Sequence, residues 1–246
     1  MKTHRCSSGE ELMEVRARCL VLETAEPFRS SGDQLRRCIT AMIPDDRVLH
    51  HHVEGSRRLD APSVRYVVIR GIPQLIGVGD GLPALEKVYA LPDIRLTGRC
   101  GPQPVEAREL WDVHARIGAG TAFATYTTLT PWLALNQRNH RRYQEARNRA
   151  ARNAILEEIF IGNVLAMLGS FGCRVETRLE ARILRCREVT VQHKRTPMLG
   201  FRATLETNAV LHPWLGIGKL VSKGYGLFVP EEKLGVARGG GFPMSG

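Results

Sequence analysis

The sequence of 246 residues lacks the features that mark several protein classes. Its six cysteines stand far apart with no Cys-x-x-Cys pair, which excludes a zinc ribbon and a compact disulfide framework. The first residues hold no apolar core of a signal peptide, and no run approaches the roughly 20 apolar residues of a membrane span. We therefore expect a cytoplasmic protein with reduced thiols and no membrane partner.

Patterns typical of metal binding are also missing. Outside one histidine triplet, the remaining histidines form no i,i+2 or i,i+4 pair, and there is no His-x-x-x-His motif or Asp-rich cluster. We expect neither a metal nor another cofactor.

Charge is distributed unevenly along the chain. The net charge is +10, from 35 Lys and Arg against 25 Asp and Glu. Residues 1–120 carry a balance of only +1, whereas residues 121–246 hold 18 basic and 9 acidic residues. Arginine supplies 29 of the basic residues, and its planar guanidinium suits phosphate groups and stacks on bases. A basic half beside a neutral half predicts that the second half binds a polyanion.

The most informative motif is segment 216–226, Gly-Ile-Gly-Lys-Leu-Val-Ser-Lys-Gly-Tyr-Gly. Glycine admits positive φ and close approach of a ligand, and exposed backbone N–H groups beside two lysines favour an anion. Both flanks are strand-like, which argues against a Walker loop and a dinucleotide fingerprint. The alternative is a glycine-rich hairpin whose lysines are edge charges. As a loop that contacts a phosphate backbone, it would do so through Gly216, Gly218, Lys219, Ser222, Lys223, Gly224, Tyr225 and Gly226.

A run of arginines leads into the helix predicted in this basic half. Residues 138–152 include six arginines and one acidic residue. Such a run can be the solvated face of a helix. Because it shares a half with the glycine loop, we expect it to face nucleic acid, with Arg138, Arg141 and Arg142 as contacts.

Hydrophobic periodicity predicts two similar halves. In the first, a strand over 14–23, a helix over 31–43, a hairpin over 64–78, a helix over 81–89 and a strand over 94–96 follow the ferredoxin-like order β-α-β-β-α-β. The second half repeats strands and a helix, with strands expected over 123–129, 174–191 and 198–206. Residues 98–120, rich in glycine and proline, hold the best boundary. We expect an α+β fold of two tandem ferredoxin-like (RRM-like) domains, residues 1–118 and 119–246.

Candidate catalytic residues lie in the histidine triplet at 50–52. In an extended segment, His50 and His52 project to one side while His51 points away. Two imidazoles near neutral pH suit concerted acid–base chemistry, one neutral and one protonated. RNA supplies its own 2′-hydroxyl nucleophile, so this route needs no metal. The triplet could instead be incidental, or half of a zinc site.

The loop and the histidines together resemble the CRISPR-associated repeat-RNA endoribonucleases of the RAMP superfamily. The nearest branch carries a His-Asn-His-like triplet, in which His50 and His52 take the places of the two family histidines. A strand of the pattern Pro-x-hydrophobic-Gln-Tyr-Lys follows in that branch and matches residues 62–71. Segments 129–136 and 208–228 match as well, and the similarity spans residues 12–230.

The resemblance implies a protein that binds CRISPR repeat RNA and cleaves the precursor transcript within each repeat. His50 and His52 would be general acid and base, and Tyr66 would orient the scissile phosphate or a base. Further partners left open are other subunits of a CRISPR effector complex and a second copy of the chain. Two rival functions also remain: a non-catalytic RAMP subunit that holds RNA, and a metal-dependent nuclease with the triplet as ligands.

Two residues depart from the family strand. Arg65 and Val67 stand where Gln and Lys are usual, so the cation expected from this strand is absent at Val67. Arg65 alternates to the face opposite Tyr66. The cation could come from another basic residue, and the candidates are Arg47, Arg57, Arg58, Lys219 and Lys223.

Overall fold

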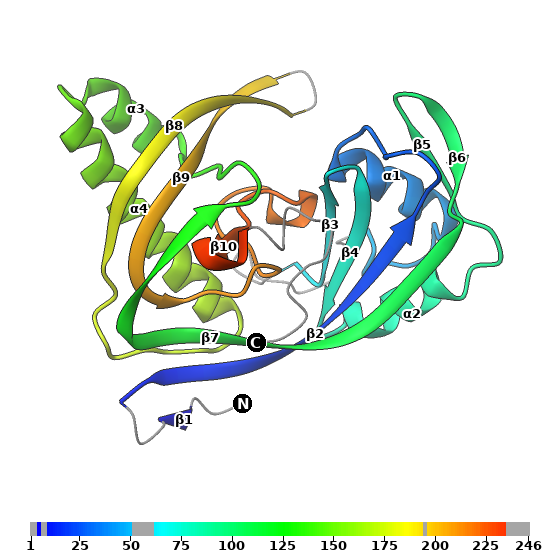
Figure 1. Ribbon diagram of the computed structural model, residues 1–246, viewed down its shortest axis with the longest axis horizontal. Coiled ribbons are helices and arrows are strands. Elements are labelled where there is room, and N and C mark those ends of the chain that lie inside the picture. The colour runs from blue at the N-terminus through cyan, green and yellow to red at the C-terminus, as the bar shows by residue number, and fades with distance from the viewer. Residues whose placement is uncertain (1–3, 6–8, 51–61, 194–195, 235–246) are drawn as a thin grey trace. The chain divides into compact units, whose positions relative to one another are not determined.

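The computed structural model of the protein describes residues 4–5, 9–50, 62–193 and 196–234, and it confirms the α+β class (Figure 1). The chain divides into two compact units. What we call the N-terminal unit is Val15–Ala115 together with Ser222–Gly224. Of the described residues, the C-terminal unit contains those up to Glu14, Arg116–Val221 and those from Tyr225 to Leu234. The units therefore exchange short segments and do not follow the order of the chain.

The N-terminal unit has a ferredoxin-like topology. Its sheet has the order β3-β4-β2-β7, made of β3 (Val64–Ile69), β4 (Ile72–Val78), β2 (Glu11–Glu23) and the first part of β7 (Ala107–Thr128). Helices α1 (Gly32–Met42) and α2 (Gly81–Tyr89) complete the β-α-β-β-α-β order. Ser31 caps α1 by accepting a hydrogen bond from the Gln34 amide at 3.3 Å, as the capping-box pattern predicts.

The core of this unit lies between the helices and one face of the sheet. Because side chains alternate along a strand, Leu20 and Leu22 of β2 face the helices together with Tyr66 of β3 and Leu75 of β4. Leu35 and Ile39 of α1 and Leu85 of α2 pack against them, and all are buried. Helical and strand periods thus meet in one apolar layer.

The prediction that residues 94–96 form the closing strand of this sheet was wrong. Residues 95–98 form β5 (Arg95–Gly98), which pairs with β6 (Gly101–Pro104) in a separate hairpin. The fourth strand of the sheet is instead the first part of β7. Residues 107–120 therefore form strand, although their glycines and the prolines before them suggested a boundary.

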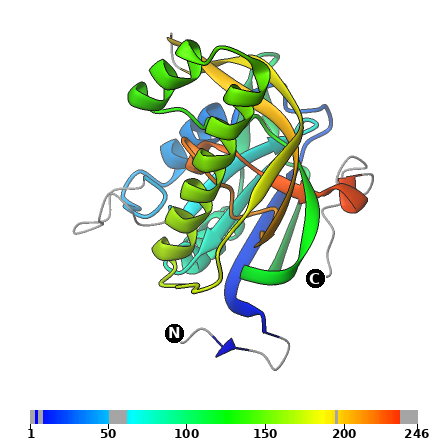
Figure 2. The ribbon, with the colours of Figure 1, turned by 90° about the vertical axis from the view of Figure 1, so that its left-hand side faces the viewer.

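The C-terminal unit repeats this order with one substitution. Its strands run β8-β9-β7-β10, made of β8 (Ala181–His193), β9 (Thr196–Val210), the second part of β7 and β10 (Phe228–Pro230). The short strand β1 (His4–Arg5) pairs with the first residues of β2. Helices α3 (Gln137–Glu145) and α4 (Arg149–Ser170) lie between β7 and β8 in sequence, and Figure 2 shows α4 along the β8–β9 hairpin. The glycine loop takes the place of a second helix and contains the 3₁₀ turn η1 (Val221–Lys223). A second 3₁₀ turn, η2 (Glu231–Lys233), follows β10.

An aromatic cluster forms the core of this unit. The rings of Trp132, Phe160 and Phe228 lie 5.5 to 5.9 Å apart in edge-to-face geometry. Among the described helices, α4 alone is long and apolar enough by length and composition to cross a membrane, although the sequence analysis found no such run. Its residues Leu156, Phe160 and Val164 are buried in the unit, as expected for a helix that packs on the protein core.

Candidate functional site

The segment that carries the histidines begins with a turn built around Asp46. The Asp46 carboxylate accepts hydrogen bonds from the amides of Val48 at 3.0 Å and Leu49 at 3.1 Å. Its second oxygen accepts from Lys87 Nζ of α2 at 2.6 Å. Asp46 is only 7% exposed. An aspartate that bonds the N–H groups two and three residues later fixes a tight turn, so Asp46 sets the path of the chain into His50.

The charge on Asp46 is held by its partners. Burial alone would raise the pKa of this carboxyl group, but the hydrogen bonds from Lys87 and from the Leu49 amide outweigh it and lower the pKa. Asp46 therefore stays ionised at neutral pH and keeps accepting from the turn.

Two further side chains hold the backbone next to the histidine. The Tyr66 hydroxyl donates to the Leu49 carbonyl at 2.9 Å, and the Arg36 guanidinium donates to the His50 carbonyl. Tyr66 is 1% exposed, and burial raises the pKa of its hydroxyl, which remains a donor. The sequence analysis expected Tyr66 to orient RNA. In the structure its hydroxyl reaches the backbone just before His50, which suits a positioning role.

His50 is the last described residue of this segment. Its amide donates to the Asp46 carbonyl at 3.2 Å, its side chain is partly buried, and Nε2 is shielded from solvent. His51, His52, Arg57 and Arg58 lie outside the described residues. The same-side placement of the two catalytic candidates therefore stays a prediction.

Arg65 lies on the face of β3 opposite Tyr66, as strand alternation requires. It is 1% exposed, and its Nε and Nη1 atoms have no hydrogen-bond partner among the residues that the structure describes. Burial lowers the pKa of this guanidinium to about 10. Val67, where the family has lysine, is fully buried.

The four glycines of the loop all have positive φ, which the sequence predicted from their use in tight backbone turns. They serve the packing of the protein itself. A Cβ on Gly226 would lie 1.9 Å from the Ile217 carbonyl oxygen, and one on Gly218 would lie within 3.0 Å of Trp132 and Asn163 atoms. The flank over 211–214, expected to be strand, forms a turn closed by a hydrogen bond from Leu215 to His212.

One part of the loop belongs to the N-terminal unit. The Lys223 ammonium pairs with Asp33 in the first turn of α1 at 2.5 Å. A Cβ on Gly224 would lie 2.8 Å from the Tyr66 carbonyl oxygen, so the loop passes directly over β3. Burial would raise the pKa of Asp33, but hydrogen bonds from Lys223 and Arg37 hold it at about 2.

The loop residues expected to contact RNA thus have different surroundings. Lys223 is engaged in the ion pair with Asp33, and Gly216, Gly224 and Gly226 are buried. Gly218 and Lys219 are exposed. Ser222 and Tyr225 are partly buried. Lys219 is therefore the loop cation best placed for a ligand.

The predicted arginines lie on α3. Arg138 and Arg141 are exposed, whereas Arg142 forms two hydrogen bonds with Glu158 of α4, at 2.8 and 3.2 Å. This pair is on the surface and contributes little to stability.

A groove that the sequence did not single out lies where α3 ends and α4 begins. It has a volume of about 640 Å³, and four arginines line it: Arg147, Arg149, Arg152 and Arg187. Arg152 lies 5.2 Å from the Tyr143 ring centroid and 3.6 Å from Glu188. Arg147, Arg149 and Arg152 fall in the arginine run 138–152, from which the sequence analysis named only other members as contacts, and Arg187 comes from β8.

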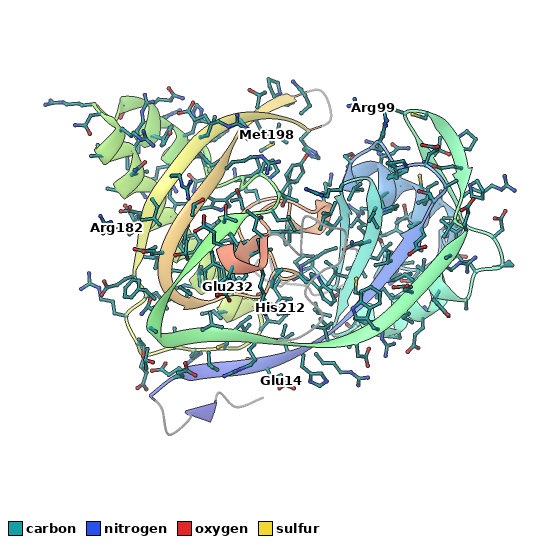
Figure 3. The ribbon with its side chains drawn as sticks, in the orientation of Figure 1. Glu14, Arg99, Arg182, Met198, His212 and Glu232 are labelled. Atoms are coloured by element: carbon teal, nitrogen blue, oxygen red, sulfur yellow. The ribbon has the colours of Figure 1, made fainter. Side chains whose placement is uncertain are left out.

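Strand β8 continues the basic surface. Arg182, Arg185 and Arg187 are exposed along it, and Figure 3 shows Arg182 projecting from the outer edge of the strand. Arg185 pairs with Glu231 at 3.1 Å. The charge excess of the second half is thus concentrated in part on the α3–α4 junction and β8, where it can hold a phosphate backbone.

Comparisons with known proteins cover both halves of the chain. Residues 13–108 match the family model of the Cas6b N-terminal domain, and residues 118–230 match that of the Cas6b C-terminal domain. A crystal structure of Cas6b superimposes with a TM-score of 0.76 at 25% identity, covering 89% of this chain and all of that one. A second, of the CRISPR RNA processing endoribonuclease Cas6b, gives 0.68 at 24% identity with the same coverage. An uncharacterized protein of Methanocaldococcus jannaschii, MJ0978, is 32% identical over 48% of this chain and 79% of its own length.

Proposed function

The chain belongs to the Cas6b family, and we propose that it is an endoribonuclease that cuts CRISPR precursor RNA once within each repeat. The main support for assigning this activity to particular residues is the turn before His50, whose backbone is held in place by three side chains. Asp46, Tyr66 and Arg36 fix the backbone on the approach to the histidine pair. Such bracing is what a site needs in order to hold a general acid or base in one place.

In the proposed reaction, one histidine of the pair His50 and His52 removes the proton from the RNA 2′-hydroxyl. The resulting oxygen attacks the adjacent phosphorus, the P–O5′ bond breaks, and the other histidine protonates the leaving 5′-oxygen. The products are a 2′,3′-cyclic phosphate and a 5′-hydroxyl end. Proton transfer by the two imidazoles accounts for every bond change, so the route requires no metal ion.

RNA would be held mainly by the C-terminal unit. The arginine groove at the α3–α4 junction, Arg138 and Arg141 on α3 and Lys219 in the loop offer cations for a phosphate backbone. Other subunits of an effector complex or a second copy could share that RNA, and the cytoplasm is the compartment where transcripts of repeats are made.

The test is cleavage of the repeat transcript from the protein's own genome by purified variants. His50→Ala and His52→Ala should each lower the single-turnover rate by roughly two to four orders of magnitude, the usual contribution of a general acid or base. RNA affinity should change little. His114→Ala, an exposed histidine of β7, is the control. Near-normal rates in both variants would reject the catalytic assignment.

The same substrate tests the nucleophile. A single 2′-deoxy substitution just upstream of the scissile phosphate should abolish cleavage and preserve binding, because one lost hydroxyl contact contributes only about 1 kcal/mol. EDTA should leave the rate unchanged. Cleavage that stops on chelation and returns with Zn²⁺ or Mg²⁺ would favour a metal-dependent nuclease.

A further inference from the structure

A pocket of about 460 Å³ lies in the N-terminal unit beside the turn that joins β3 and β4. Val21 of β2, Gln74 of β4 and Trp111 of β7 contribute to its wall. Val21 and Gln74 are directly opposite in the β2–β4 ladder, and their neighbours Leu22 and Leu75 face the helices. The two therefore project from the other face of the sheet. In RRM-type modules, aromatic residues on a sheet face stack RNA bases.

Gln74 gives the pocket a buried polar group that the protein does not satisfy. Its side chain is 2% exposed, and Oε1 has no hydrogen-bond partner among the described residues. Buried amides in folded proteins are normally paired. A ligand in the pocket would supply the missing partner, and an amide can both donate and accept.

The remaining lining favours a ligand that donates hydrogen bonds and has a flat ring. Glu23 and Glu109 line the pocket, are exposed, and form no ion pair with any residue in the described ranges. The partly exposed indole of Trp111 offers a stacking surface. Guanine carries adjacent N1–H and N2–H donors on one edge, which matches carboxylate and amide oxygens.

Arg70 stands at the same pocket in an unfavourable backbone conformation. Its φ is +53°, and Gly71 follows with φ +83°, so the two form a tight turn. Asn or Asp is the usual residue before glycine in such a turn, because other side chains are disfavoured at positive φ. Strain of this kind clusters at functional sites. An exposed guanidinium there suits a phosphate.

We propose that this pocket binds one unpaired guanosine of the repeat RNA, with the base on Trp111 and against Gln74 and the phosphate at Arg70. The inference rests on the proposed function and adds to it a base-reading site in the N-terminal unit. A basic side chain of a partner protein would also suit the two carboxylates, and the test below separates the two.

The experiment measures affinity for the repeat transcript and for a series in which each guanosine is replaced in turn by inosine, which lacks the 2-amino group. The wild-type protein should lose about tenfold in affinity at one position. Gln74→Leu and Trp111→Ala should each weaken binding of the unmodified transcript about tenfold, with no further loss from inosine at that position. Gln103→Leu, on β6 of the same unit, should bind normally.

The change in melting temperature of each variant shows whether weaker binding could come from a folding defect. Gln74→Leu removes a buried amide oxygen that has no partner among the described residues, and Arg70→Asn relieves the strained turn, so both should melt at the same or a higher temperature. Arg70→Asn should nevertheless bind the transcript several-fold more weakly. Weaker binding by a more stable protein cannot come from unfolding.

The outcomes separate this inference from the proposed function. If the wild-type protein neither binds nor cuts the transcript, the proposed function fails. If it does both, while no inosine position and no pocket variant alters affinity, only the pocket inference is overturned. Loss of oligo-arginine peptide binding in Gln74→Leu, with RNA affinity unchanged, would also overturn it and assign the pocket to a protein.

Discussion

Among single residues, Asp46 has the largest share in placing the histidine segment. Asp46→Asn keeps the size of the side chain but loses the ion pair with Lys87 and leaves weaker acceptors for the turn. We expect the single-turnover cleavage rate at saturating RNA to fall about tenfold with RNA affinity unchanged, since a small displacement of a catalytic group is costly.

The neighbouring residue supplies the control for that measurement. Asp45 is exposed and adjacent in sequence, so Asp45→Asn changes the same charge without touching the turn. Equal rates for the two variants, measured well below their melting temperatures, would show that Asp46 does not position the site.

His212 makes stability depend on pH. Burial, and then the charge of Lys233, lowers the pKa of this imidazole to about 4, and its Nδ1 accepts from the Trp214 amide at 3.4 Å. The unfolded chain takes up its proton near pH 6.5, before the folded one does. The contribution of neutral His212 to the free energy of unfolding is therefore complete above about pH 6.5 and is lost as the pH falls toward 4.

We expect His212→Asn to flatten the pH dependence of the unfolding free energy between pH 6.5 and 4 by on the order of 2 kcal/mol. Asparagine keeps an oxygen that can accept from Trp214 and carries no titrating group. Denaturant unfolding at several pH values measures the effect, and His140→Asn on the exposed face of α3 is the control. An unchanged slope in His212→Asn would show that another group is responsible.

At the scale of helices and strands, local sequence patterns were sufficient to predict an element where the pattern was strong. The helices expected over 31–43 and 81–89 match α1 and α2, because a capping serine and apolar spacing mark them locally. The early part of β7 was missed although residues 111–117 alternate apolar and polar. Glycine and proline around that stretch concealed the strand, and only its pairing with β2 in the sheet reveals it.

The sequence predicted the types of residue in the candidate site but not which residues interact with one another. The glycines of the loop predicted backbone with positive φ, and the alternation of side chains along a strand predicted that Arg65 and Tyr66 lie on opposite faces of β3. The pairing of Lys223 with Asp33 joins residues about 190 apart in sequence, which no local pattern can encode. The turn at Asp46 did carry a local signal, an aspartate followed by the amides it bonds, and was overlooked.

Within the glycine loop, packing and ligand contact can be separated by substitution. Gly226→Ala places a methyl group 1.9 Å from the Ile217 carbonyl oxygen and strains a backbone with φ +72°, so we expect a loss of roughly 2 kcal/mol or more in stability. Lys219→Ala should leave the melting temperature unchanged and lower RNA affinity several-fold. If Lys219→Ala binds RNA normally, the loop is a structural element alone.

The charge asymmetry of the whole molecule predicts strong salt dependence of RNA binding. Each phosphate neutralised contributes a slope of about −0.7 to −0.9 in log K against log salt. Arg147→Ala with Arg149→Ala should reduce the steepness of that slope by about one to two, because both line the basic groove. Arg99→Ala, exposed in the nearly neutral half, should not change it. A slope near zero in the wild-type protein would exclude the groove as a phosphate site.

The exchange of short segments between the units sets an order of assembly during synthesis. Ser222–Gly224 completes the N-terminal unit, yet the ribosome makes it about a hundred residues after Ala115. At roughly 5–20 residues per second, the nascent N-terminal unit waits on the order of 5–20 s for Lys223 to reach Asp33. Lys223 and Gly224 can reach α1 and β3 only after β9 has been made, so the unit that carries His50 matures after most of the C-terminal unit has been synthesised.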